Sequence, residues 1–174
     1  MKTLQNLIIL SSFIIFCSCS NVLYHQAMPE DGKTLSSFPK ELIGQFADQE
    51  GDTLFIYPNS YKYGEINKST LFEGQLGDDL ILKKSKGYYF LNFKNAEGYW
   101  EMIAAQLIGK ELQLLCIDTE NEEQIKIINS HLKGNKAKSL KKEGKFVINP
   151  SDKELFELLK DERICDRSLL YKVK

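Results

Sequence analysis

Short apolar runs separated by turn residues fill most of the chain, and this pattern restricts the fold more than any other feature. Residues 53–57 and 88–93 are rich in β-branched and aromatic side chains, whereas residues 77–79 and 95–98 are rich in Gly, Asn and Asp. Such alternation is typical of strands joined by tight turns. It predicts a mainly β fold, a single antiparallel β-barrel or sandwich of about eight strands.

The segment from residue 88 to residue 107 predicts a hairpin whose two faces both need cover. Side chains alternate along a strand, so Tyr89 and Leu91 lie on one face of its first strand and Phe90 lies on the other. Trp100 and Met102 share one face of its second strand. Neither strand is polar along a whole side. A second layer or the C-terminal segment must therefore cover each face.

The same hairpin carries the best candidates for ligand contact. Ala104 and Ala105 are small enough to leave room for a bulky neighbour or for a ligand. Aromatic rings with polar tips stack on sugars and apolar ligands, and they also build cores. The candidate contacts are Tyr88, Tyr89, Tyr99, Trp100 and Met102.

One helix is predicted, near the C-terminus. Ser151 has N-cap chemistry, and Glu154 follows it at the spacing of a capping box. The apolar residues of 155–159 then recur at helical spacing. Residues 146–148 and 169–173 favour flanking strands, which gives a strand–helix–strand ending. Residues 125–128 are expected to form a further strand after an acidic turn.

Signals of catalysis and of metal binding are sparse. The two histidines, His25 and His131, offer no close pair of metal ligands, and no nucleophile elbow or phosphate-binding glycine loop is present. We therefore expect no catalytic residue, metal or cofactor. The formal net charge of −1 gives no reason to expect nucleic acid as a partner.

The N-terminus has the order of parts found in a secretory signal. Lys2 precedes an apolar run at residues 7–16, which at about 1.5 Å per residue is too short to span a bilayer core of roughly 30 Å. Ser18 and Cys19 follow. This arrangement resembles the lipobox of bacterial lipoproteins, although Phe16 and Cys17 stand where a Leu and a small residue are commoner. The resemblance implies cleavage before Cys19 and acylation of its thiol, with palmitate among the chains.

This resemblance divides the chain into three parts. Residues 1–18 would be a lipoprotein signal peptide, 19–37 a flexible tether and 38–174 the β-rich domain. The resemblance implies export to a compartment that permits disulfides. Two alternatives are therefore open: a disulfide between Cys116 and Cys165, or two free thiols.

Two further resemblances concern the family and the source. Gly44 and Phe46 open a strand that looks like the start of lipocalin-like small β-barrel lipoproteins, over a short stretch in which Phe46 replaces the usual Trp. The Lys-, Ile- and Asn-rich composition resembles envelope proteins of the Bacteroidota. Ser20, which follows the lipidated cysteine, fits sorting to the outer membrane.

These inferences lead to one leading hypothesis and two alternatives. The chain is expected to be a lipid-anchored protein of the outer membrane, facing the periplasm or the cell surface, that binds a lipid, glycan or protein partner without catalysis. The alternatives are a small periplasmic hydrolase and an immunity-type inhibitor that acts through a protein interface. A cavity lined by Trp100, Met102 and their neighbours would favour small-ligand binding, and two facing carboxylates would favour the hydrolase.

Overall fold

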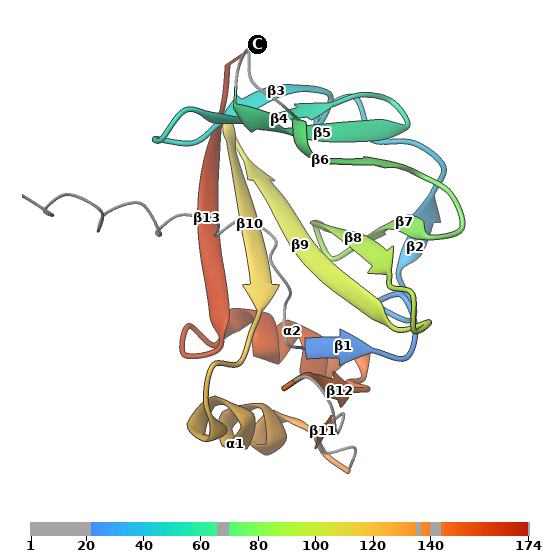
Figure 1. The fold of residues 1–174 in the computed structure, drawn as a ribbon, viewed down its shortest axis with the longest axis vertical. Helices are drawn as coiled ribbons and strands as arrows, with labels where there is room; N and C mark the ends of the chain where they lie inside the picture. Colours follow the sequence, from blue (N-terminus) through green and yellow to red (C-terminus); the bar gives the residue numbers. More distant parts are fainter. Residues whose placement is uncertain (1–21, 66–69, 135–136, 140–143, 174) are drawn as a thin grey trace, which may run out of the picture.

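A curled sheet forms the body of the protein, and two helices lie at one end of it (Figure 1). The computed structural model describes residues 22–65, 70–134, 137–139 and 144–173. Far more of the described residues lie in strands than in helices, which confirms the mainly β prediction. The sheet is an antiparallel half-barrel.

The described residues form thirteen strands and two helices, so the expectation of about eight strands and one helix is wrong in number. Three of the additional strands have only two or three residues, too few to show alternation in the sequence. The elements are β1 (Val22–Tyr24), β2 (Lys33–Leu35), β3 (Gly44–Ala47), β4 (Asp52–Ile56), β5 (Ser60–Glu65), β6 (Thr70–Gln75), β7 (Leu80–Ser85), β8 (Tyr88–Lys94), β9 (Trp100–Ile108), β10 (Glu111–Ile117), α1 (Glu122–His131), β11 (Lys138–Ser139), β12 (Phe146–Ile148), α2 (Asp152–Lys160) and β13 (Cys165–Lys172).

The strand order explains the shape of the half-barrel. Neighbouring strands run β2–β7–β8–β9–β10–β13–β3–β4–β5–β6, and every pair in this series is antiparallel. Among the described residues β2 and β6 end the series without pairing to each other, so the barrel stays open. The short strands β1, β12 and β11 extend the sheet from the beginning of β9.

Both faces of the β8–β9 hairpin are covered, as its pattern predicts. On the outer face, Phe90 and Ala104 are fully buried in one apolar cluster with Phe156 of α2. On the concave face, Tyr89 belongs to a second cluster with Leu112. The strand–helix–strand ending therefore covers one face, and the curl of the sheet covers the other.

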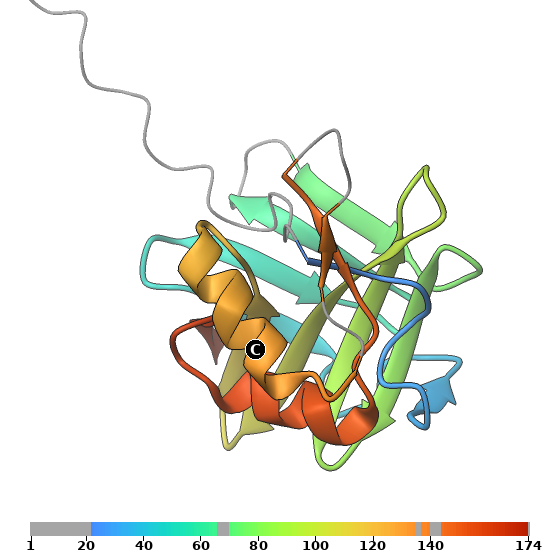
Figure 2. The same cartoon turned by 90° about the horizontal axis from the view of Figure 1, so that it is seen from below.

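Helix α2 forms where the sequence predicts it. Ser151 is the N-cap, and its side chain and that of Glu154 complete a capping box. Leu155, Leu158 and Leu159 are buried on the side that faces the sheet. Figure 2 shows α2 lying beside α1 under one end of the sheet, and the two helices are in contact.

Helix α1 replaces the strand expected at residues 125–128. Asn121 caps it by accepting hydrogen bonds from the backbone of the first turn, where two glutamates favour the helix N-terminus. Ile128 and Leu132 are buried, and Ile125 lies one turn before Ile128. The spacing of these three residues is helical. The short apolar run at residues 125–128 is also typical of a strand, which is why a strand was expected there.

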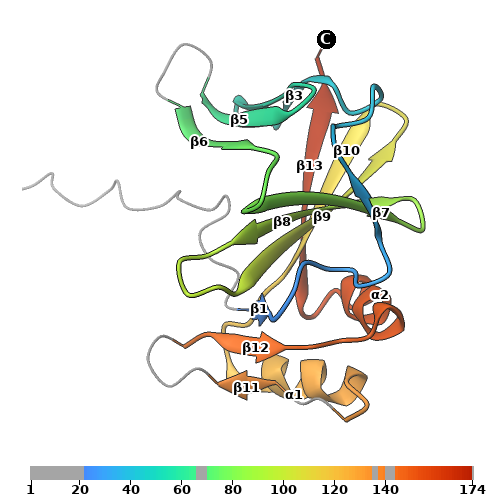
Figure 3. The ribbon, with the colours of Figure 1, turned by 90° about the vertical axis from the view of Figure 1, so that its right-hand side faces the viewer.

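The tether expected at residues 19–37 is wrong for its described part. Val22, Leu23 and Tyr24 form β1, which is almost fully buried. Figure 3 shows β1 beside β12, with which it pairs in parallel, and Tyr24 also pairs with Trp100 of β9.

The signal peptide at 1–18 and the lipidation of Cys19 lie outside the described residues and stay predictions. Neither described helix is long and apolar enough to cross a bilayer.

Hydrogen bonds from distant strands hold the segment after β1. Buried Asn92 of β8 accepts from the Met28 amide at 2.7 Å and donates to the Met28 carbonyl at 2.9 Å. The Lys83 ammonium of β7 donates to the carbonyls of Ala27 and Pro29 at 2.9 and 2.8 Å. These long-range partners order a segment whose own sequence has no periodicity.

We predict that Asn92→Ala destabilises the protein by about 1–3 kcal/mol, because both backbone groups of Met28 would be buried without a partner. Urea unfolding measures the loss. Gln75→Ala is the control, since Gln75 is exposed on β6 and should change stability by less than about 0.5 kcal/mol. Equal effects of the two substitutions would show that Asn92 does not hold the segment.

Candidate functional site

An apolar cavity of about 240 Å³ lies on the concave side of the half-barrel. Strands β8, β9 and β10 form one wall, and β4, β5 and β6 form the facing wall. Ligand pockets typically have roughly 300–1,000 Å³. The cavity is therefore suited to a small apolar molecule or to part of a longer chain.

The first wall is the concave face of three neighbouring strands. Leu91 of β8 pairs with Ile103 of β9, and Ala105 of β9 pairs with Leu114 of β10. All four line the cavity. The alternation that places these residues on one face is visible in the sequence, and Ala105 is small enough to leave space above the sheet.

Aromatic side chains dominate the facing wall. Tyr61 lies directly across from Gly74 of β6, where a Cβ atom would come within 2.6 Å of the Tyr61 ring. Glycine is thus required for the ring to lie across β6. The Tyr61 ring meets Phe93 edge-on at 6.2 Å, which connects the two walls.

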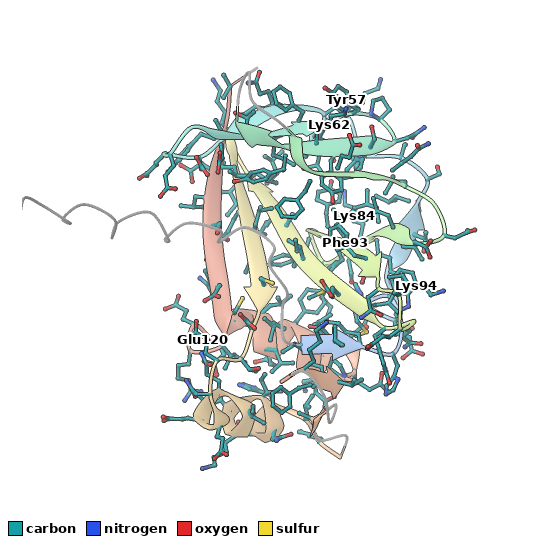
Figure 4. The ribbon with its side chains drawn as sticks, viewed as in Figure 1. Tyr57, Lys62, Lys84, Phe93, Lys94 and Glu120 are labelled. Atoms are coloured by element: carbon teal, nitrogen blue, oxygen red, sulfur yellow. The ribbon has the colours of Figure 1, made fainter. Side chains whose placement is uncertain are left out.

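The outer side of the same strands is polar. Lys62, between the two cavity tyrosines of β5, pairs with Glu73 at 3.1 Å. Figure 4 shows Lys62 and Tyr57 over the outer side of these strands and Phe93 nearer the interior. The alternation of β5 therefore separates a solvated face from the cavity face.

Tyrosine hydroxyls at the boundary of the cavity are bonded to surface carboxylates. The Tyr89 hydroxyl donates to Glu41 at 2.6 Å and accepts from the Lys84 ammonium at 2.8 Å. The Tyr63 hydroxyl donates to Asp52 at 3.0 Å. Burial, and then the bond to Glu41, raise the pKa of Tyr89 above its ordinary value. These rings give the cavity apolar surface while their polar ends are satisfied outside it.

Glu101 of β9 is the charged side chain among the described residues that line the cavity. It is half-buried, and it pairs in register with Phe93 of β8. Burial raises the pKa of Glu101 above its ordinary value, and the positive charge of Lys145 offsets part of that rise. A single carboxylate is thus set into an otherwise apolar lining.

Two of the five ligand contacts expected from the sequence line the cavity. Tyr89 and Met102 are among its lining residues, whereas Trp100 is buried in the cluster on the opposite face of β9. The ammonium of Lys94 lies 5.7 Å from the centre of the Trp100 ring. Met102 belongs to that cluster too, as the sequence alternation predicts, and it also borders the cavity. The sequence does not indicate which face of the strand borders the open space.

Tyr88 and Tyr99 also lie away from the cavity. The Tyr88 ring packs 5.8 Å from that of Phe156 in α2, so it belongs to the helix-covered face. The Tyr99 ring is half-buried and lies 5.7 Å from that of His25. Among the residues not chosen as contacts from the sequence, Tyr61 and Tyr63 line the cavity. Both are among the tyrosines whose rings could stack on a ligand, and their alternation with Lys62 puts them on one face of β5.

The candidate disulfide is not formed. Cys116 of β10 pairs in register with Asp166 of β13, while Cys165 pairs with Ile117. Neighbouring positions along a strand point to opposite faces, so one sulfur faces the cavity and the other faces the helix-covered cluster. Burial raises the pKa of Cys165 to about 11. A thiol so seldom ionised is a packing group rather than a nucleophile.

A polar cluster joins the two helices away from the cavity. His131 at the end of α1 is bonded to the Asp161 carboxylate at 2.9 Å, and Arg163 donates to the same carboxylate at 2.6 Å. Arg163 and His131 hold the pKa of Asp161 well below its ordinary value.

Among the described residues no group of three or more His, Cys, Asp or Glu side chains is placed to hold a metal ion.

No protein-family model, curated protein or solved structure matches this chain. The site is therefore interpreted from its own geometry. Its apolar walls can bury a hydrocarbon group, which is favourable by about 25 cal/mol per Å² of apolar surface removed from water. Its single carboxylate can accept hydrogen bonds from a polar group at one end of such a ligand.

Substitutions at two adjacent alanines of β9 test which face of the strand borders the cavity. We predict that Ala105→Leu leaves the free energy of unfolding unchanged or raises it by up to about 1 kcal/mol, because the added methyl groups enter the cavity. Ala104→Leu should lower it by about 1–3 kcal/mol, since Ala104 is fully buried on the helix-covered face. Urea unfolding of both variants measures the contrast, and equal losses would argue against a cavity at Ala105.

Proposed function

We propose that this protein is a lipid-anchored protein of the cell envelope whose half-barrel binds a small apolar ligand, such as an acyl chain, without changing it chemically. The observation that carries the proposal is the apolar cavity of about 240 Å³ between the two walls of the sheet. A hydrolase would call for two facing carboxylates, and a protein inhibitor for a filled interior and a flat patch. An apolar cavity with a single carboxylate is the arrangement expected of a binding protein.

The N-terminal sequence supports the lipid anchor in this proposal. Residues 7–16 and Cys19 resemble a lipobox signal, and acyl chains stabilise membrane binding by about 0.8 kcal/mol per buried methylene. Val22 already belongs to the buried strand β1. The chain between Cys19 and Val22 can span at most roughly 10 Å, at 3.3–3.6 Å per residue.

A short connection has a consequence for the proposed function. It would hold the half-barrel against the membrane surface instead of on the longer tether expected from the sequence. A cavity at the surface of a bilayer is close to a large supply of acyl chains. The proposed location and the proposed ligand therefore support each other.

We predict that a neutral naphthylamine dye, which fluoresces in apolar surroundings, binds saturably to a chain beginning at Ser20. This chain keeps every described strand and helix, since all lie between Val22 and Val173. Ala105→Phe should weaken dye binding at least about tenfold, or about 1.4 kcal/mol, because its ring occupies the cavity.

Ile108→Phe is the matched control for the dye experiment. It adds a similar ring at a side chain that is 54% exposed at the end of the same strand, so dye affinity should not change. Circular dichroism verifies that both variants fold, and Ala105→Leu replaces Ala105→Phe if the larger ring prevents folding. Absence of saturable binding, or equal binding by Ala105→Phe and Ile108→Phe, would overturn the proposed ligand site.

The anchor has a separate test. Cells that express the full chain should incorporate labelled palmitate into it, and Cys19→Ser should abolish the label because the acylated thiol is removed. Cys17→Ser is the control and should keep the label. An unlabelled wild-type chain, or a labelled Cys19→Ser chain, would contradict the lipoprotein proposal without affecting the dye result.

A further inference from the structure

We infer that Glu101 selects the chemical class of the ligand: an apolar chain that ends in a cationic amine or another hydrogen-bond donor, rather than in a carboxylate. This inference rests on the proposed function and specifies the ligand of the same cavity. Its basis is the position of one carboxylate among aliphatic and aromatic lining residues.

The position of Glu101 suits contact with the polar end of a ligand. Its neighbours in the lining include Phe93, Ile103 and Met102, which are apolar. Glu101 is half-buried and lies on the same face of β9 as Ile103 and Ala105. A ligand with its hydrocarbon part against Ile103 and Ala105 can therefore bring its polar end to this carboxylate.

Two tyrosine hydroxyls of the walls have partners on the protein. The hydroxyls of Tyr63 and Tyr89 donate to Asp52 and Glu41 at the surface. These bonds direct the polar ends of both tyrosines to partners on the protein. Among the described residues of the lining, Glu101 alone carries a carboxylate, which is a strong hydrogen-bond acceptor.

The charge of Glu101 determines which polar ends are favoured. A carboxylate accepts hydrogen bonds from an ammonium or a hydroxyl group, and bonds to a charged group are worth about 1.5–3 kcal/mol, or at least about tenfold in affinity. A fatty acid anion would place a second negative charge beside Glu101, which is unfavourable. Lys145 lies near Glu101 but is not among the residues that line the cavity. It therefore does not provide a binding site for an anionic ligand inside the cavity.

Competition with the bound dye tests the inference. Decylamine, decanol and decanoate share one chain length and differ only in the polar end, and the chain beginning at Ser20 is used near neutral pH. We expect decylamine to displace the dye at least about tenfold more effectively than decanoate, with decanol between them. Glu101→Gln should reduce this preference to about twofold or less, because the glutamine keeps the shape and loses the charge.

Glu97→Gln is the matched control. Glu97 lies exposed in the turn between β8 and β9, so this variant changes the net charge of the protein equally without changing the cavity. It should keep the wild-type preference for the amine. Equal displacement by the three ligands in the wild type, or a preference that Glu101→Gln leaves unchanged, would overturn the inference while the proposed cavity stands. Failure of the dye and all three ligands to bind would overturn the proposed function itself.

Discussion

The β8–β9 hairpin carries apolar side chains on both faces, and most of the structure follows from the need to cover them. Burial of one side alone would leave rings such as Tyr89 or Phe90 in water. The chain covers the outer face with α2 and the concave face with its own curled sheet. The two helices, the half-barrel and the buried position of β1 are parts of this one solution.

The two covers differ in how completely they fill space. Helix α2 packs Leu155 and Leu158 directly onto the sheet, and both are fully buried. On the other face the cover is a sheet that bends away from the hairpin, and the small side chain of Ala105 does not fill the gap. Open curvature and a small residue thus leave a cavity where the helix leaves none. The binding that we propose uses this difference.

The sequence predicts those features whose signals are local. The mainly β class, the capping box at Ser151 and the two apolar faces of the hairpin could all be read from adjacent residues. Features set by distant partners were missed. Residues 22–30 are ordered by β12, Asn92 and Lys83, and nothing within the segment indicates this. The same limit applies to Trp100: alternation gives its face, but only the tertiary fold determines which face borders the cavity.

Methyl resonances in nuclear magnetic resonance spectra test the central claim most directly, because each wall and each core carries its own methyl groups. Decanol added to the chain should shift the resonances of Leu54 and Ile103, which line the cavity. It should leave those of Leu155 and Leu158, under the helix-covered face, unchanged. Shifts of equal size in both groups, or shifts confined to the second group, would contradict a ligand site within the half-barrel.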